Sequence, residues 1–129
     1  MLAPLSRAIA ALALLTCLMG HDHGCGAPDG TPTAARCDPR LRWDNFGRDF
    51  MTRYCTSCHG STVRGGARHG APTDHDLDTP ESIRTARDHI DLTAASGPGG
   101  TNTYMPPYGP LPTQREREDL GRWLACGAP

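Results

Sequence analysis

The run CTSCH at positions 55–59 constrains this chain more than any other feature of its sequence. It places two thiols and an imidazole within a single short stretch of backbone. The rest of the chain offers little material for a core, since aromatic residues make up only 5% of its 129 positions. A chain this short buries a modest fraction of its surface, so a small core needs a covalent staple or a cofactor. We therefore expect one small domain in which a group other than side chains fills part of the interior.

A C-x-x-C-H run has three chemical uses. In the first, both thiols form thioethers with the vinyl groups of a haem while the imidazole ligates the iron. The second is a structural zinc site, whose ligands at nearly Cys2His2 spacing would be Cys55, Cys58, His69 and His75. The segment between these ligands is poor in apolar residues, and zinc leaves His59 without a role. The third is a reactive dithiol, which usually follows a strand in a βαβ unit, whereas here a predicted helix precedes the pair.

Three amphipathic helices and no strand are predicted, so the expected fold class is all-α. The first helix covers residues 41–54 and leads directly into the Cys cluster. The second is short and begins at Pro80, with Thr79 as its N-cap. The third follows Thr113 and Glu116, which have the spacing of a capping box. Gly and Pro are frequent between the helices, which indicates loops.

Met105 is a further candidate for cofactor chemistry. It lies in the Pro-Gly-rich segment YMPPYGP, where a lone Met side chain is unusual. A thioether is a good soft ligand for haem iron. Pro106 and Pro107 restrict the backbone next to it, which would hold the sulfur at a fixed distance from a metal.

These motifs together resemble the small monohaem class I cytochromes c of bacteria. The resemblance covers residues 41–127 and rests on CTSCH after an aromatic-bearing helix, YMPP downstream, and the closing helix REDLGRWLACG. It implies a cytochrome c fold in which three main helices are wrapped around one covalently attached haem c. By this resemblance Cys55 and Cys58 carry the thioethers, and His59 and Met105 are the proximal and distal iron ligands.

The same resemblance implies a crossing of the first and last helices. The aromatic positions of that crossing are matched by Phe46 or Phe50 and Trp123. Cys37 and Cys126 flank the two helices, so the crossing would allow a disulfide between them. Cys25 is left over, either as an alternative partner for Cys37 or as a free thiol.

The N-terminal region predicts export. Residues 1–19 read as an export signal, because one Arg precedes an apolar run too short for a permanent membrane anchor. Lipoprotein-type processing at Cys17 and ordinary cleavage around residues 24–27 stay as alternatives. Residues 20–37 are polar and predict a flexible linker, which leaves residues 38–129 as the cytochrome c domain. We expect a periplasmic protein, either free or anchored to the membrane by lipid at Cys17.

The predicted ligands imply the function. Two protein ligands saturate the iron and leave no position for a substrate, so we expect a single-electron carrier and not an enzyme. One alternative is an open iron with Met105 displaced, as in a sensor or small enzyme. Another is bis-His iron, with His69, His75 or His89 as the second ligand. A structural zinc module is the last alternative.

Charge bears on the partners. The formal net charge is −1, and all thirteen basic residues are Arg, so no strong single-sign field is predicted and nucleic-acid binding is not expected. We expect a monomer that docks on periplasmic or membrane-associated redox proteins. Arg64 and Arg68 are candidates for a local docking patch.

Overall fold

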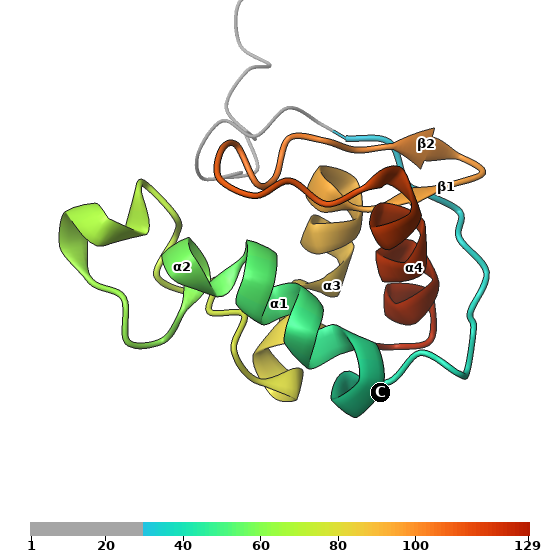
Figure 1. The fold of residues 1–129 in the computed structure, drawn as a ribbon, viewed down its shortest axis with the longest axis horizontal. Coiled ribbons are helices and arrows are strands. Elements are labelled where there is room, and N and C mark those ends of the chain that lie inside the picture. Colours follow the sequence, from blue (N-terminus) through green and yellow to red (C-terminus); the bar gives the residue numbers. More distant parts are fainter. Residues whose placement is uncertain (1–29) are drawn as a thin grey trace, which may run out of the picture.

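Four α-helices dominate residues 30–129, the part of the chain that the computed structural model describes (Figure 1). The elements in chain order are the π-helix η1 (Trp43–Gly47), α1 (Arg48–Tyr54), α2 (Thr56–His59), the 3₁₀-helix η2 (Gly65–Arg68), α3 (Pro80–Ala94), β1 (Ser96–Gly97), β2 (Gly100–Thr101) and α4 (Gln114–Ala125). None of these helices is long and apolar enough to cross a membrane. The predicted export signal, Cys17 and Cys25 lie outside the described residues.

The first predicted helix is present as η1 followed by α1. It begins where Arg42 is extended, and the Asn45 side chain accepts a hydrogen bond from the Arg42 amide at 2.8 Å. It ends at Cys55, whose backbone (φ −120°, ψ −47°) interrupts the helix, so that α2 is a separate short helix. The Cys cluster therefore accounts for a fourth helix where three main helices were predicted.

The prediction of a short second helix was wrong, because α3 has 15 residues. Its start agrees with the sequence, since the Thr79 hydroxyl accepts a hydrogen bond from the Ser82 amide at 3.2 Å. In its last turn, the side chains of Thr93 and Ala94 are buried. Small and polar residues give no clear apolar periodicity, so the sequence pattern ends before the helix does.

The apolar faces of α1, α3 and α4 meet in one core. Its fully buried side chains include Met51, Ile83, Leu120 and Trp123. The absence of strands was not fully borne out, since β1 and β2 form a two-residue antiparallel pair.

The first and last helices cross at Gly47. A Cβ atom built on Gly47 would lie 2.4 Å from the Trp123 ring, so only glycine permits this approach. The Phe46 ring meets Trp123 edge-on, with ring centroids 5.9 Å apart, and Trp43 stacks on it at 6.4 Å. The implied crossing is present, and of the two candidates Phe46 and Phe50 it is Phe46 whose ring meets Trp123.

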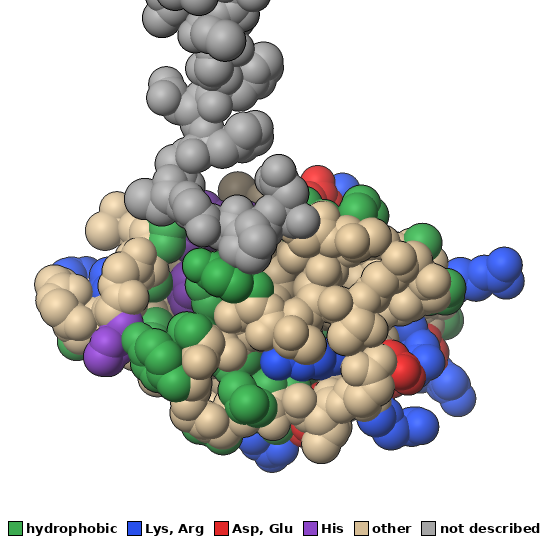
Figure 2. Space-filling model, turned by 90° about the horizontal axis from the view of Figure 1, so that it is seen from above, with side chains coloured by type: hydrophobic (Ala, Val, Ile, Leu, Met, Phe, Trp, Pro, Cys, Tyr) green, Lys and Arg blue, Asp and Glu red, His purple; other side chains and the backbone are tan. Residues whose placement is uncertain are grey.

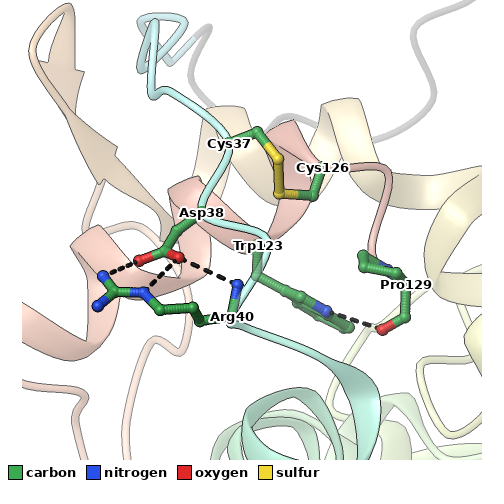
Figure 3. Close-up of a disulfide and its surroundings, with 6 residues drawn as sticks. All are labelled: Cys37, Asp38, Arg40, Trp123, Cys126 and Pro129. Carbon is green, nitrogen blue, oxygen red and sulfur yellow. Dashed lines mark hydrogen bonds and ion pairs between the residues drawn. A yellow bond between two sulfur atoms is a disulfide. The ribbon is translucent and has the colours of Figure 1, made fainter.

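A disulfide joins Cys37 to Cys126, as the resemblance implied, with Cα atoms 4.6 Å apart (Figure 3). It ties the segment before η1 to the residue that caps α4. The Trp123 indole nitrogen, on the same helix, donates a hydrogen bond to the Pro129 carbonyl at 3.3 Å. The segment before η1 and the segment after α4 are therefore both attached at the C-terminal end of α4.

Residues 30–36, which we expected to belong to the flexible linker, lie against α3 and the β1–β2 pair. Thr33 is buried, and its hydroxyl and amide both donate to the Asp91 carboxylate, at 2.6 and 3.0 Å. Its carbonyl accepts a hydrogen bond from the Gly99 amide at 2.7 Å. Hydrogen bonds order this polar segment, and an argument based on apolar burial alone overlooks them.

Candidate functional site

The two thiols of the C-x-x-C-H run lie within one helical turn. The amides of Cys58 and His59 both donate to the Cys55 carbonyl, at 3.1 and 2.9 Å. Cys55 and Cys58 are partly buried, and within residues 30–129 neither forms a disulfide. Two thiols and an imidazole are therefore presented together from the end of α1 and from α2.

The Cys55 thiol is unsuited to dithiol redox chemistry. Burial raises its pKa to about 12, although the positive charge of Arg117 acts in the opposite direction. A reactive C-x-x-C thiol needs a lowered pKa, because the thiolate is the nucleophile. Cys55 instead packs against the hydrophobic core, and no βαβ unit surrounds it within the described part of the chain.

The imidazole of His59 is held in one tautomer. Its Nδ1 lies 2.9 Å from the His75 carbonyl oxygen. A carbonyl can only accept, so Nδ1 carries the proton and Nε2 is left with a free lone pair. Burial lowers the pKa of His59, which favours the neutral form. An imidazole oriented in this way is ready to ligate a metal through Nε2.

Arg68 organises the loop that carries His75. It is buried and donates to the Asp76 carboxylate at 2.9 Å and to the carbonyls of Gly60 and Ala71, both at 3.1 Å. The prediction that Arg68 contributes to an exposed docking patch was therefore wrong. The Gly-rich, charged composition around Arg68 predicted a loop, which led us to expect Arg68 at the surface. In the fold, main-chain carbonyls of this loop accept the hydrogen bonds of the buried guanidinium.

Met105 is held by its main chain between α3 and α4. Its amide donates to the Thr93 carbonyl and its carbonyl accepts from Arg117 Nη1, both at 2.8 Å. Its side chain is partly buried and packs against the same core cluster as Cys55.

A groove of about 590 Å³ lies beside Met105. It is lined by Thr103, Tyr104, Pro106, Pro107, Leu111, Pro112, Gln114 and Arg117. Figure 2 shows hydrophobic and histidine side chains gathered on one part of the molecular surface, while many charged side chains lie toward the opposite edge. The large hydrophobic residues that are exposed within residues 30–129 are Tyr104, Tyr108 and Leu111. All three belong to the loop that contains Met105.

The other three histidines among residues 30–129 have ring partners of their own. The His69 ring lies against Tyr108, with centroids 5.4 Å apart, and the His75 ring lies against His89 at 4.9 Å. Among the described residues, no three His, Cys, Asp or Glu side chains are grouped so as to hold a metal ion. The four ligands of the alternative zinc site are therefore not brought together.

The donor set fits a haem. It offers two neighbouring thiols, an imidazole with a free Nε2, and a thioether on the same core. Sequence reasoning missed Arg117, which donates to the Met105 carbonyl. Its signal was nevertheless present, because Arg117 falls on the apolar face of α4, three and seven residues before Leu120 and Leu124.

Comparison with known proteins adds one finding. A family model described as cytochrome c oxidase, cbb3-type, subunit III matches residues 45–124, which is more than half of the chain. The matched span contains the C-x-x-C-H run, Met105 and nearly all of α4. Neither the curated proteins nor the solved structures contain a match to this chain.

Proposed function

Because the chain belongs to the family of cytochrome c oxidase, cbb3-type, subunit III, we propose that it is a single-electron carrier with one haem, as in a small class I cytochrome c. A cytochrome c domain is an electron-carrying haem protein, and its haem is of the covalent c type. When bound, the haem supplies an iron that accepts one electron and passes it on. The chain contains one C-x-x-C-H run, which supports one haem per chain.

Cys55 and Cys58 would form the thioethers, and His59 would ligate the iron through Nε2. The observation that carries this assignment is the hydrogen bond from His59 Nδ1 to the His75 carbonyl. It orients the ring and sets the tautomer that a metal ligand needs, and the carbonyl raises the basicity of the free nitrogen.

Met105 would be the second iron ligand. Its main-chain amide and carbonyl both form hydrogen bonds, which supports a fixed position for the Cα atom from which the side chain extends. Two protein ligands would leave no iron position for a substrate, so the carrier itself would not be an enzyme. Bis-His iron is less well supported, because the rings of His69, His75 and His89 have aromatic partners of their own.

The proposed setting is outside the cytoplasm, where cytochrome c domains usually occur or associate with membranes. We propose an export signal over residues 1–19 and a cytochrome c domain over 38–129. Of the linker expected over 20–37, only residues 20–29 keep that role in the proposal, because Thr33 is bonded to Asp91 and Cys37 to Cys126. Lipidation of Cys17 is one route to the membrane. The protein would be a monomer that exchanges electrons with a membrane-associated redox complex, as the oxidase name of the family suggests. The exposed Tyr104, Tyr108 and Leu111 would meet that partner.

The absorption spectrum of the exported protein tests the proposal. We expect a sharp reduced α band and a weak far-red ferric band from a sulfur–iron bond. Met105→Ala should abolish the far-red band and lower the reduction potential, while Met51→Ala, which removes a buried core Met, should keep the far-red band if the variant folds. A far-red band that survives in Met105→Ala would overturn the Met105 assignment. A protein without covalent haem would overturn the proposed function as a whole.

A further inference from the structure

Arg117 is a buried cation on α4 without a carboxylate partner among residues 30–129. Only 4% of its surface is exposed. The hydrogen bonds that it makes in this part of the chain all go from Nη1 to main-chain carbonyls: Ala94 at 2.7 Å, Met105 at 2.8 Å and Asn102 at 3.1 Å. Burying a charge without a counter-charge lowers the stability of the fold, so a buried, unpaired arginine calls for a functional reason.

The three carbonyls belong to the two ends of one segment. Ala94 ends α3, and Asn102 and Met105 follow β2. Asn102 is itself buried, and its side-chain amide donates to the carbonyls of Thr31 and Asp91, at 2.7 and 2.8 Å. Arg117 therefore closes the turn of chain that leads from α3 to Met105, and it fixes the Met105 carbonyl while the Thr93 carbonyl fixes the Met105 amide.

Arg117 also places its charge next to the proposed iron ligand. Its Nη1 lies 2.8 Å from the Met105 carbonyl oxygen. A guanidinium stays protonated in proteins, so this charge is permanent. A bound haem iron would carry one positive charge less after it accepts an electron from a redox partner. A nearby permanent cation favours that reduced state.

We propose that Arg117 is a positioning residue for Met105 and that its charge raises the reduction potential of the haem. This inference rests on the proposed function, in which Cys55 attaches the haem and Met105 ligates the iron. Without Arg117, the main chain at Met105 would lose one of its two anchors. External ligands should then displace the thioether more easily, because they compete with a weaker internal ligand.

Four variants of the full, haem-loaded chain separate the two effects. Arg117→Met removes the charge and the donors, Arg117→Gln keeps amide donors without the charge, and Arg117→Lys keeps the charge with donors. The matched control is Arg115→Met on the same helix, whose side chain is 84% exposed. Two quantities are measured for each variant: the reduction potential, and the affinity of the ferric protein for imidazole, followed by loss of the far-red band.

We expect Arg117→Met to bind imidazole at least about tenfold more tightly than the wild type, which corresponds to about 1.4 kcal/mol. Its potential should shift downward, as should that of Arg117→Gln, while Arg117→Lys should recover most of the shift. Arg115→Met should match the wild type in both measurements. If Arg117→Met does not fold, the comparison of Arg117→Gln with Arg117→Lys still tests the effect of charge. The imidazole affinity of Arg117→Gln should stay close to that of the wild type, because its amide can still donate to the Met105 carbonyl.

Equal potentials and equal imidazole affinities across the Arg117 series would overturn the inference. The wild type distinguishes this result from failure of the proposed function. If its far-red band is present and is lost in Met105→Ala, the ligand assignment stands whatever Arg117 does. If the wild type has no such band, the Met105 assignment fails first, and the inference fails with it.

Discussion

At the scale of single residues, the site depends on main-chain carbonyls more than on other side chains. The His75 carbonyl orients the His59 ring, and the Met105 carbonyl receives a hydrogen bond from Arg117. Every residue has a main-chain carbonyl, whatever its side chain. The residue types at positions 75 and 105 therefore do not predict these two contacts. His59 and Arg117 donate these hydrogen bonds, so substitutions that test the contacts should be made at the donors.

Gly47 is a residue at which a single methyl group should have a measurable effect. Alanine ordinarily stabilises a helix relative to glycine. At Gly47, however, the added Cβ would lie 2.4 Å from the Trp123 ring, which is fully buried. We expect Gly47→Ala to lower the free energy of unfolding by about 1–3 kcal/mol, a typical cost of overpacking.

Denaturant titration of the haem-loaded protein measures this effect. Gly66→Ala is the control, because nothing lies within 4 Å of a Cβ at that position. It should leave the unfolding midpoint nearly unchanged. A Gly47→Ala protein as stable as the wild type would show that the helix crossing is looser than this contact implies.

At the scale of elements, the start of α4 is joined to α1 by one carboxylate. Glu116 closes the predicted capping box, since its side chain accepts a hydrogen bond from the Thr113 amide at 2.8 Å. It also accepts from the Tyr54 hydroxyl at 2.9 Å. The capping box could be predicted from local spacing, whereas the contact with Tyr54 depends on how α1 and α4 pack.

This carboxylate should make stability depend on pH. The Thr113 amide lowers the pKa of Glu116, with smaller contributions from the Thr113 and Tyr54 hydroxyls. A pKa that is lower in the folded state gives stability that is present above the ordinary Glu value, about 4.3, and is lost as the pH falls through the folded value. Glu116→Gln should therefore be less stable than the wild type at neutral pH, and the difference should shrink in acid.

Unfolding midpoints of both proteins at neutral pH and at about pH 3 measure this change. Glu118→Gln is the control, because Glu118 is on the same helix and its partners among residues 30–129 are both on α4, Arg122 and Gln114. Its difference from the wild type should be small at both pH values. A Glu116→Gln difference that stays constant with pH would contradict the role given to this carboxylate.

At the scale of the whole molecule, long-range ties compensate for a small core. The disulfide joins positions 89 residues apart, and the segment 30–36 is bonded to α3 through Thr33 and Asp91. Both ties come from the region before the first helix. The domain therefore extends further toward the N-terminus than its apolar pattern indicates.

Removal of the disulfide should destabilise the fold without changing the site. In the chain-entropy model, closing a loop of this length contributes about 4.6 kcal/mol. We expect the Cys37→Ser, Cys126→Ser double variant to lose up to this amount of unfolding free energy, measured by denaturant titration. The absorption spectrum of its native state should match that of the wild type, since neither residue belongs to the proposed haem site. An unfolding free energy equal to that of the wild type would contradict the contribution of the cross-link.

The sequence by itself determined the features that depend on local order along the chain. These features depend on residues that lie close together in the sequence. They are the N-caps Thr79 and Thr113, the C-x-x-C-H run, and the lone Met in a Pro-rich loop. The relation of the chain to the cytochrome c family could also be inferred from these motifs.

Only the tertiary structure decided which distant groups meet. Three features bring together segments whose spacing in the sequence does not predict that they meet. They are the hydrogen bond from His59 to the His75 carbonyl, the helix crossing at Gly47, and the burial of Arg68 and Arg117. The physical reason is that packing and main-chain hydrogen bonds act through space. An arginine that a sequence pattern assigns to the surface can be buried when the fold surrounds it with carbonyl oxygens.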